Sequence, residues 1–570
     1  MITQVEVGGI PAVLAPTTGP MQAGLAFRVG VADEPLAKRG ITHLIEHLAL
    51  HSFGPVDHHH NGATGVEYTY FHTQGTAEEI VAFLNGVCAG LSDPPMPRLA
   101  VEKEILRTEQ SSRGEGPTDA LAMWRHGARD YGVATYPEWG LTGIDEDDLR
   151  DWIATYFTRE NAALWIAGPE VPAGLELRLP SGERRSVPVA SSALPVRPAY
   201  FPGPSNVVAW NAVVRREARA AVFAGVLDRA LLRSLRQESG LSYTVMAGYE
   251  PRADGTGVIS AFADALAEKQ SAVLDGFVGV LAAARLGEVG PAEVTTVIEA
   301  RCTELAQAEE TGGRLAGQAF NLLAGRPVQS LDEAVAELRA VTPADVAEVA
   351  AAAVADGLLM TPGRTTADTA GYVPAPDSSE SLVEGAEHAS LQEPGLRLIA
   401  GADGVSLVNE SQATVLFDRC AAVLVWPDGA RRFVGEDGIQ VHLEPTLFGD
   451  GHAVIAELDT RIRPETRTPM PPRDPKAIPV PPASVPQARR GRRARTPLTG
   501  VRRVLTLLVL LLQIPVALLF GGGGILLETR ASSAPYDQDL VLAMAVFCLA
   551  VAVVMTFGAI GSIRRLRGLP

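Results

Sequence analysis

No stretch constrains this chain more than the nine residues Gly40-Ile-Thr-His43-Leu-Ile-Glu46-His47-Leu48. In a helix, residues three and four apart share one face, so His43, Glu46 and His47 would project toward one point. Two neutral imidazoles one turn apart form half of a tetrahedral zinc site, and a carboxylate beside them can hold a metal-bound water. The pattern H-x-x-E-H therefore predicts a hydrolytic zinc helix, with two surface histidines on an amphipathic helix as the alternative.

A third ligand is predicted on the helix that begins near Arg98. Glu102 and Glu109 are seven residues apart, which places them two turns along one helical face. Glu109 can therefore be the third metal ligand, with Glu102 supporting the site from behind. A solvated charged face is the commoner fate of such carboxylates, so this helix alone does not decide between the two readings.

Other clusters of ligand-type residues need no metal. The three consecutive histidines His58–His60 cannot all face one ion from an ordinary backbone, so we expect a solvated loop. The acidic run Asp145–Asp148 is typical of the first turn of a helix. The four cysteines are far apart and form no C-x-x-C pair, which fits a reducing compartment.

Length and charge bound the remaining possibilities. A chain of 570 residues has room for about three or four domains. Its net charge of -17 argues against a nucleic-acid partner. We expect an α/β domain over 1–190 and a second over 205–362 with a similar order of elements, which ends in three helices. A linker at 363–393, a small β-rich domain at 394–463 and a Pro/Arg-rich linker at 464–498 are expected to follow.

The excess hydrophobicity lies at the C-terminus. Residues 504–527 and 540–560 predict two transmembrane helices within 499–567, which would contact membrane lipid. Basic residues flank both ends of this pair, at Arg489–Arg495 and again at Arg564, Arg565 and Arg567. Positive flanks stay in the cytoplasm, so we expect a cell-membrane protein with two spans whose preceding domains are cytoplasmic.

Several segments together resemble the pitrilysin/insulinase family of zinc peptidases, the inverzincins. These are Val29-Gly-Val-Ala-Asp-Glu-Pro35, the H-x-x-E-H stretch, Asn61-x-x-Thr64-x-x-Glu67-x-Thr69, and the glutamate pair seven residues apart. The resemblance implies an α+β fold whose two α/β domains are homologous, sandwich-like halves. The interval from His47 to Glu109 is 62 residues, shorter than the family usually has, which affects the expected shape of the substrate cleft.

The resemblance also implies roles for individual residues. By that resemblance His43, His47 and Glu109 bind Zn²⁺, Glu46 is the general base, Glu102 supports the ligands and Asn61 lies along the bound peptide substrate. The second domain lacks H-x-x-E-H, but its Arg236 and Tyr243 resemble the family's arginine and tyrosine pair. Such a pair would stabilise the oxyanion formed at the scissile carbonyl. A helix end capped by Gly240, followed by a strand, is the alternative.

The expected function follows from this resemblance. In the family, zinc and the arginine–tyrosine pair commonly come from different two-domain units, which implies a homodimer or a dimer with a related subunit. We expect a membrane-anchored zinc endopeptidase that hydrolyses peptides or processes a peptide precursor. The alternative is a non-catalytic scaffold or accessory subunit of a membrane peptide-processing or export complex, with a transporter as partner.

Overall fold

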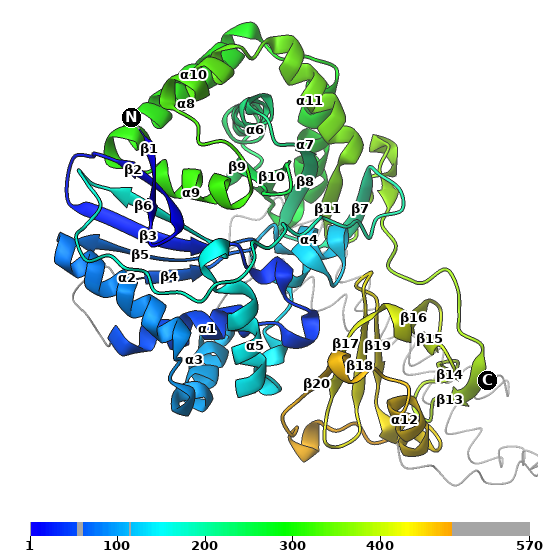
Figure 1. Ribbon diagram of the computed structural model, residues 1–570. Coiled ribbons are helices and arrows are strands. Elements are labelled where there is room, and N and C mark those ends of the chain that lie inside the picture. The colour runs from blue at the N-terminus through cyan, green and yellow to red at the C-terminus, as the bar shows by residue number, and fades with distance from the viewer. Residues whose placement is uncertain (1, 54–60, 113, 115, 482–570) are drawn as a thin grey trace, which may run out of the picture. The chain divides into compact units, whose positions relative to one another are not determined.

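The computed structural model describes residues 2–53, 61–112, 114 and 116–481 (Figure 1). The predicted transmembrane spans at 504–527 and 540–560, their basic flanks and the histidines 58–60 lie outside the described residues. Among the residues that the structure does describe, none of the helices combines the length and the apolar character needed to cross a bilayer.

The N-terminal part of the chain builds a mixed sheet of six described strands. In spatial order they are β1 (Thr3–Val7), β2 (Ile10–Ala15), β6 (Ala162–Ala167), β3 (Met21–Phe27), β5 (Thr69–Gly75) and β4 (Asn61–Thr64). Only the β2–β6 pair is parallel among these strands. One face is covered by α1 (Ile41–Leu50), α2 (Ala77–Ser92), α3 (Leu99–Ser112) and α5 (Glu146–Tyr156) (Figure 1).

A second mixed sheet follows in the chain. Its described strands, in spatial order, are β12 (Val373–Pro374), β7 (Ala199–Gly203), β11 (Leu358–Pro362), β8 (Val207–Arg215), β10 (Thr256–Asp264) and β9 (Val245–Pro251). The helices of this half are α6 (Ala218–Leu231), a π-helix (Leu232–Glu238), α7 (Gln270–Arg285), α8 (Pro291–Thr311), α9 (Leu315–Leu323), α10 (Leu331–Arg339) and α11 (Pro343–Asp356). Residues 270–356, all described, thus form five α-helices where three were expected, because glycines with positive φ at 287, 312 and 325 end individual helices.

Each sheet is closed on its second face by a helix from the other half. On the first sheet, Val13 and Ala163 pack against Leu315 and Ala319 of α9. On the second sheet, α4 (Asp119–His126) inserts Leu121 beside Ala209 and Met360 (Figure 1). Neighbouring residues of β2 and β6 therefore enter two different cores, which explains why these strands are apolar at every position.

Buried polar contacts also join the two halves. Arg125 of α4 is almost fully buried and donates to Asn211 Oδ1 at 2.9 Å and to Asp356 Oδ2 at 2.8 Å. Glu67, in the turn before β5, accepts hydrogen bonds from the backbone amide of Ala253 at 2.8 and 3.0 Å. Because a buried charge is tolerated only when it is paired, these contacts fix how the halves meet.

The small β-rich domain contains two four-stranded sheets. The first comprises β13 (Gly385–Ala389), β14 (Arg397–Gly401), β15 (Gly404–Val408) and β16 (Gln412–Leu416), and the second β19 (Gln440–Leu443), β18 (Arg431–Gly435), β17 (Cys420–Val425) and β20 (Arg467–Pro469), with α12 (Gly451–Asp459) beside them. Strands β12 and β13 lie in the stretch expected to be a linker at 363–393, and β20 lies beyond the expected end of the domain at residue 463. Strands β12 and β20 gain their structure from pairing with the distant strands β7 and β17, which no local pattern reveals, whereas β13 pairs with β14, the next strand in the chain.

Candidate metal centre

The H-x-x-E-H stretch forms helix α1, and its start is strongly defined. Gly40 precedes the helix with φ of 102°, a conformation that favours glycine. The carboxylate of Glu34 accepts hydrogen bonds from the amides of Gly40 and Thr42, both at 2.9 Å, and so satisfies two amides at the helix start. Leu44 and Leu48 are buried in the core of the first sheet. The helix is therefore held at its first turn and along its apolar face.

The three predicted metal ligands lie together. His43 Nε2 is 4.0 Å from Glu109 Oε2, and His47 Nε2 is 3.7 Å from Glu109 Oε1. One ligand atom from each of these residues lies within 4.8 Å of the other two. In a tetrahedral zinc site with bonds of about 2.0–2.1 Å, ligand atoms are roughly 3.3 Å apart. The residues present therefore fit a zinc ion after shifts of less than about 1 Å.

Carboxylates lie behind both histidines. His47 Nδ1 is 3.5 Å from Glu102 Oε2. His43 Nδ1 is 3.0 Å from Glu138 Oε1, a contact that the sequence analysis missed. Glu138 precedes the 3₁₀ turn Trp139–Thr142, outside any helical or strand periodicity, so no pattern in the sequence pointed to it.

Glu46 is buried next to the ligands, with only 5% of its surface exposed. Its Oε2 accepts a 2.6 Å hydrogen bond from the Thr64 hydroxyl of β4. A Cβ added to Gly62 would lie 2.7 Å from Glu46 Oε1, so the missing side chain at Gly62 makes room for the carboxylate. Burial raises the pKa of Glu46 above its ordinary value, while the Thr64 hydrogen bond and the two histidines act in the opposite direction. A carboxyl group in this environment is suited to accept and return a proton.

Asn61 begins strand β4, which lies at one edge of the sheet among its described strands. Its side chain is exposed, and its backbone pairs with His72 of β5 on one side. The strand that carries Asn61 also carries Thr64, the hydrogen-bond partner of Glu46. An extended peptide added to this edge would thus run past the candidate metal centre.

Arg236 and Tyr243 form a pair of their own in the second half of the fold. The Arg236 guanidinium lies over the Tyr243 ring, 4.8 Å from its centroid, and 74% of Tyr243 is exposed. Asp264 Oδ1 accepts a hydrogen bond from the Tyr243 amide at 2.8 Å and holds the turn between the π-helix and β9. Both side chains therefore lie on the surface, available to a ligand or to a second protein chain.

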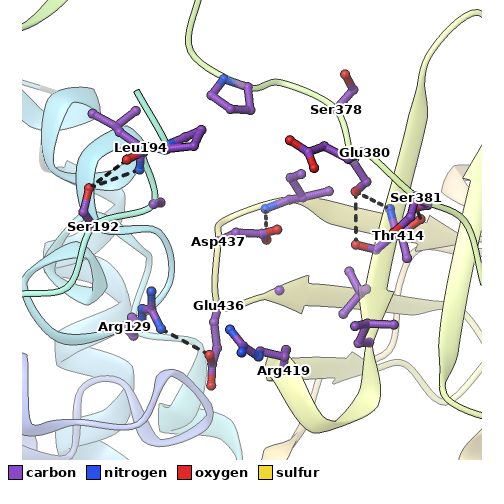
Figure 2. A pocket seen from close by; sticks show the side chains of 18 residues that line it. Arg129, Ser192, Leu194, Ser378, Glu380, Ser381, Thr414, Arg419, Glu436 and Asp437 are labelled. Carbon is purple, nitrogen blue, oxygen red and sulfur yellow. Dashed lines mark hydrogen bonds and ion pairs between the residues drawn. The ribbon is translucent and has the colours of Figure 1, made fainter. Parts of the chain in front are cut away.

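The structure also contains a cavity of about 530 Å³ that none of the predicted site residues lines (Figure 2). It lies between the segment 192–195 and the β-rich domain, where Arg129 pairs with Glu436 at 3.3 Å. Arg419 faces the same space, as do Glu380 and Asp437 (Figure 2). Charges of both signs line this cavity, so its electrostatics select no particular class of ligand.

Comparison with known proteins yields structural neighbours only. No protein-family model matches the chain, and no curated protein matches it. A chain of complex III2 from Candida albicans, solved with Inz-5 bound, is 16% identical with a TM-score of 0.55, and the alignment covers 64% of this chain and 96% of that chain. The peptidase M16 inactive domain from Pseudomonas fluorescens is 14% identical with a TM-score of 0.55, over 64% of this chain and 98% of that chain. The first half of the periplasmic protease PqqL from Escherichia coli is 13% identical with a TM-score of 0.51, over 65% of this chain and 93% of that chain.

At these identities the likeness establishes the fold alone. The chain contains the mixed α/β fold of M16 peptidase domains, which agrees with the pitrilysin-like fold predicted from the sequence. One of these neighbours is described as an inactive domain, so the fold does not distinguish a peptidase from a scaffold. That distinction depends on the residues of the candidate metal centre.

Proposed function

We propose that this chain is a zinc-dependent endopeptidase whose metal is held by His43, His47 and Glu109. The observation that carries the proposal is the convergence of these three side chains, with Glu46 buried beside them. The M16-type fold is compatible with this proposal, because one structural neighbour is the first half of a periplasmic protease. When bound, zinc would polarise the scissile carbonyl and lower the pKa of a coordinated water.

The protein's own residues would perform the proton transfers and bind the substrate. Glu46 would accept the proton of the attacking water and deliver it to the leaving amine. The edge of β4 would bind the peptide as an added strand, with Asn61 beside it. Tyr243 and Arg236 would donate hydrogen bonds to the oxyanion. Because both side chains are exposed, a second copy of this chain or a related subunit could receive them at its own metal centre.

The proposed setting is the cytoplasmic side of a cell membrane. It rests on the apolar segments at 504–527 and 540–560 and their basic flanks. A peptide precursor in transit to an exporter would be a suitable substrate, with the transporter as a partner. A non-catalytic scaffold is the second candidate, since one structural neighbour is described as an inactive domain.

A metal-dependence experiment separates these two functions. The full chain, purified in detergent, is incubated with a quenched fluorescent peptide library before and after chelation, and again after zinc is restored. We expect cleavage that chelation abolishes and zinc restores. His47→Ala should remove cleavage, whereas His442→Ala, which changes an exposed histidine of the β-rich domain, should retain it. Cleavage that survives both chelation and His47→Ala, or no cleavage by the zinc-loaded parent, contradicts the proposal.

A further inference from the structure

We infer that Glu138 is a positioning residue that fixes the ring of His43 for metal binding, an inference that rests on the proposed function. Glu138 Oε1 lies 3.0 Å from His43 Nδ1, and only 6% of Glu138 is exposed. The other ring nitrogen, Nε2, faces Glu109 Oε2 at 4.0 Å. A carboxylate can only accept a hydrogen bond here, so it selects the tautomer with the proton on Nδ1. That tautomer leaves the Nε2 lone pair free for a metal.

The two histidines differ in how they are held. Glu102 is shared among three neighbours: His47 Nδ1 at 3.5 Å, His51 Nδ1 at 3.7 Å and Arg98 Nη2 at 3.0 Å. The contact between Glu138 and His43 is shorter, at 3.0 Å. His43 is therefore the more firmly oriented ligand, and its orientation depends on a residue far along the chain.

Glu138 is itself held in place from two sides. Arg39, which is buried, lies with Nη1 at 3.5 Å from Glu138 Oε1 and 3.1 Å from Glu34 Oε2. The backbone of Gly40 approaches so closely that an added Cβ would lie 2.9 Å from Glu138 Cβ. One guanidinium between two carboxylates leaves a net negative charge next to His43, which favours a bound cation.

The β-rich domain packs against the segments that hold Glu138 in place. The Thr468 hydroxyl of β20 donates to the carbonyl of Ala37, two residues before Arg39, at 3.3 Å. A Cβ added to Gly143 would lie 2.7 Å from Pro469, so β20 also packs closely against the turn that follows Glu138. The position of Glu138 is thus determined by packing that involves three separate parts of the chain, which gives it the rigidity that a positioning residue needs.

The test measures zinc affinity instead of turnover. Zinc dissociation constants are determined by competition with a chromophoric chelator for the full-length parent, Glu138→Ala and Glu138→Gln. Glu104→Ala serves as a control, because it removes an exposed carboxylate from α3, the helix of Glu109. We expect Glu138→Ala to weaken zinc binding by about 10–100-fold and the control to leave it unchanged. Glu138→Gln keeps an acceptor but loses the charge, so roughly a 3–10-fold loss is expected.

Cobalt substitution supplies a second readout. The visible spectrum of the Co²⁺-loaded protein reports the coordination geometry, and we expect Glu138→Ala to change its bands while Glu104→Ala does not. A folded Glu138→Ala protein with zinc affinity within about twofold of the parent and an unchanged cobalt spectrum overturns the inference and leaves the proposed function intact. If Glu138→Ala fails to fold, a zinc affinity of Glu138→Gln equal to that of the parent overturns the inference about Glu138 in the same way. A parent protein that binds no zinc removes both the inference and the proposed function.

Discussion

The Thr64 hydroxyl donates a 2.6 Å hydrogen bond to the carboxylate of Glu46. This contact joins the edge strand β4 to the helix that carries the two histidines. Gly62, two residues before Thr64, lies against the same carboxylate without a side chain between them. The strand that we propose to bind the peptide thus also orients the proposed general base.

Removing the Thr64 hydroxyl should therefore slow peptide hydrolysis without loss of metal. We expect Thr64→Val to lower kcat by about 10-fold or more, because a hydrogen bond to a charged group contributes about 1.5–3 kcal/mol. Steady-state kinetics and the zinc content of the same preparation measure both properties. Thr64→Ser keeps the donor and should stay close to the parent. A kcat for Thr64→Val equal to that of the parent would show that this hydrogen bond does not orient Glu46 for catalysis.

Gly40→Ala should disturb the metal centre as well as stability. Gly40 has φ of 102°, and an added Cβ would lie 2.9 Å from Glu138 Cβ. Gly371 has φ of 82° with nothing within 4 Å, which makes Gly371→Ala a matched control for backbone strain. We expect Gly371→Ala to cost about 1 kcal/mol of unfolding free energy and Gly40→Ala at least about 1 kcal/mol more. Thermal unfolding measures the difference, and only Gly40→Ala should weaken zinc binding. Equal effects of the two substitutions on the free energy of unfolding would contradict close packing of Gly40 against Glu138.

Acidification should destabilise the junction between the two halves through His126. Burial, with the nearby guanidinium of Arg252, lowers the pKa of His126 to about 3. Ring Nδ1 of His126 lies within hydrogen-bonding distance of the Ser191 carbonyl, and Nε2 lies 3.3 Å from Arg252 Nη2. A proton added to Nε2 would therefore point toward another hydrogen-bond donor, the Arg252 guanidinium. Below its ordinary pKa of about 6.5 the unfolded histidine gains a proton that the folded one does not, so stability falls as the pH falls toward about 3.

The expected size of this effect is about 2 kcal/mol between about pH 7 and about pH 5. His126→Gln offers a donor and an acceptor but does not titrate, so its stability should fall less over the same interval. Denaturant unfolding of both proteins at the two pH values measures the difference. If the stability of the parent and of the variant depends on pH in the same way, protonation of His126 does not affect the stability of this junction.

Complementation tests whether Tyr243 acts on a second chain. In a homodimer that exchanges these side chains, a mixture of inactive Glu46→Gln and Tyr243→Phe proteins forms one intact site in each mixed dimer. Random reassociation should then restore roughly a quarter of the parental rate of peptide cleavage. Each variant alone should remain inactive. If Tyr243 acts within its own chain, mixing should restore no activity.

Much of the fold could be predicted from the sequence because local patterns specify it. Helix α1 follows from the three- and four-residue spacing of His43, Glu46 and His47, and the order β8, α6, β9, β10 follows from periodicity and turn residues, whereas the five helices over 270–356 were expected as three. The exchange of α4 and α9 between the two sheets could not be predicted, since each helix shows only an apolar face and not its partner. The short strands β12 and β20 depend in the same way on distant pairing.

The candidate site shows the same division. His43, Glu46 and His47 share one face of α1, and Glu102 and Glu109 share one face of α3. Spacing in the sequence therefore predicts which residues lie together within each helix. Glu138 lies 95 residues from His43 in a loop, where no periodicity connects the two residues. Thr64 was part of a recognised pattern, but its bond to Glu46 depends on how β4 packs against α1. Contacts set by tertiary packing are those that sequence patterns leave out.

We propose that Glu46 transfers the proton in zinc-dependent peptide hydrolysis. The most direct test of this proposal is the rate of peptide cleavage by Glu46→Gln, measured on preparations whose zinc content has been determined. We expect about one zinc per chain in both proteins and a kcat for the variant that is lower by at least about 100-fold. A zinc-loaded Glu46→Gln protein that cleaves peptides as fast as the parent would contradict it.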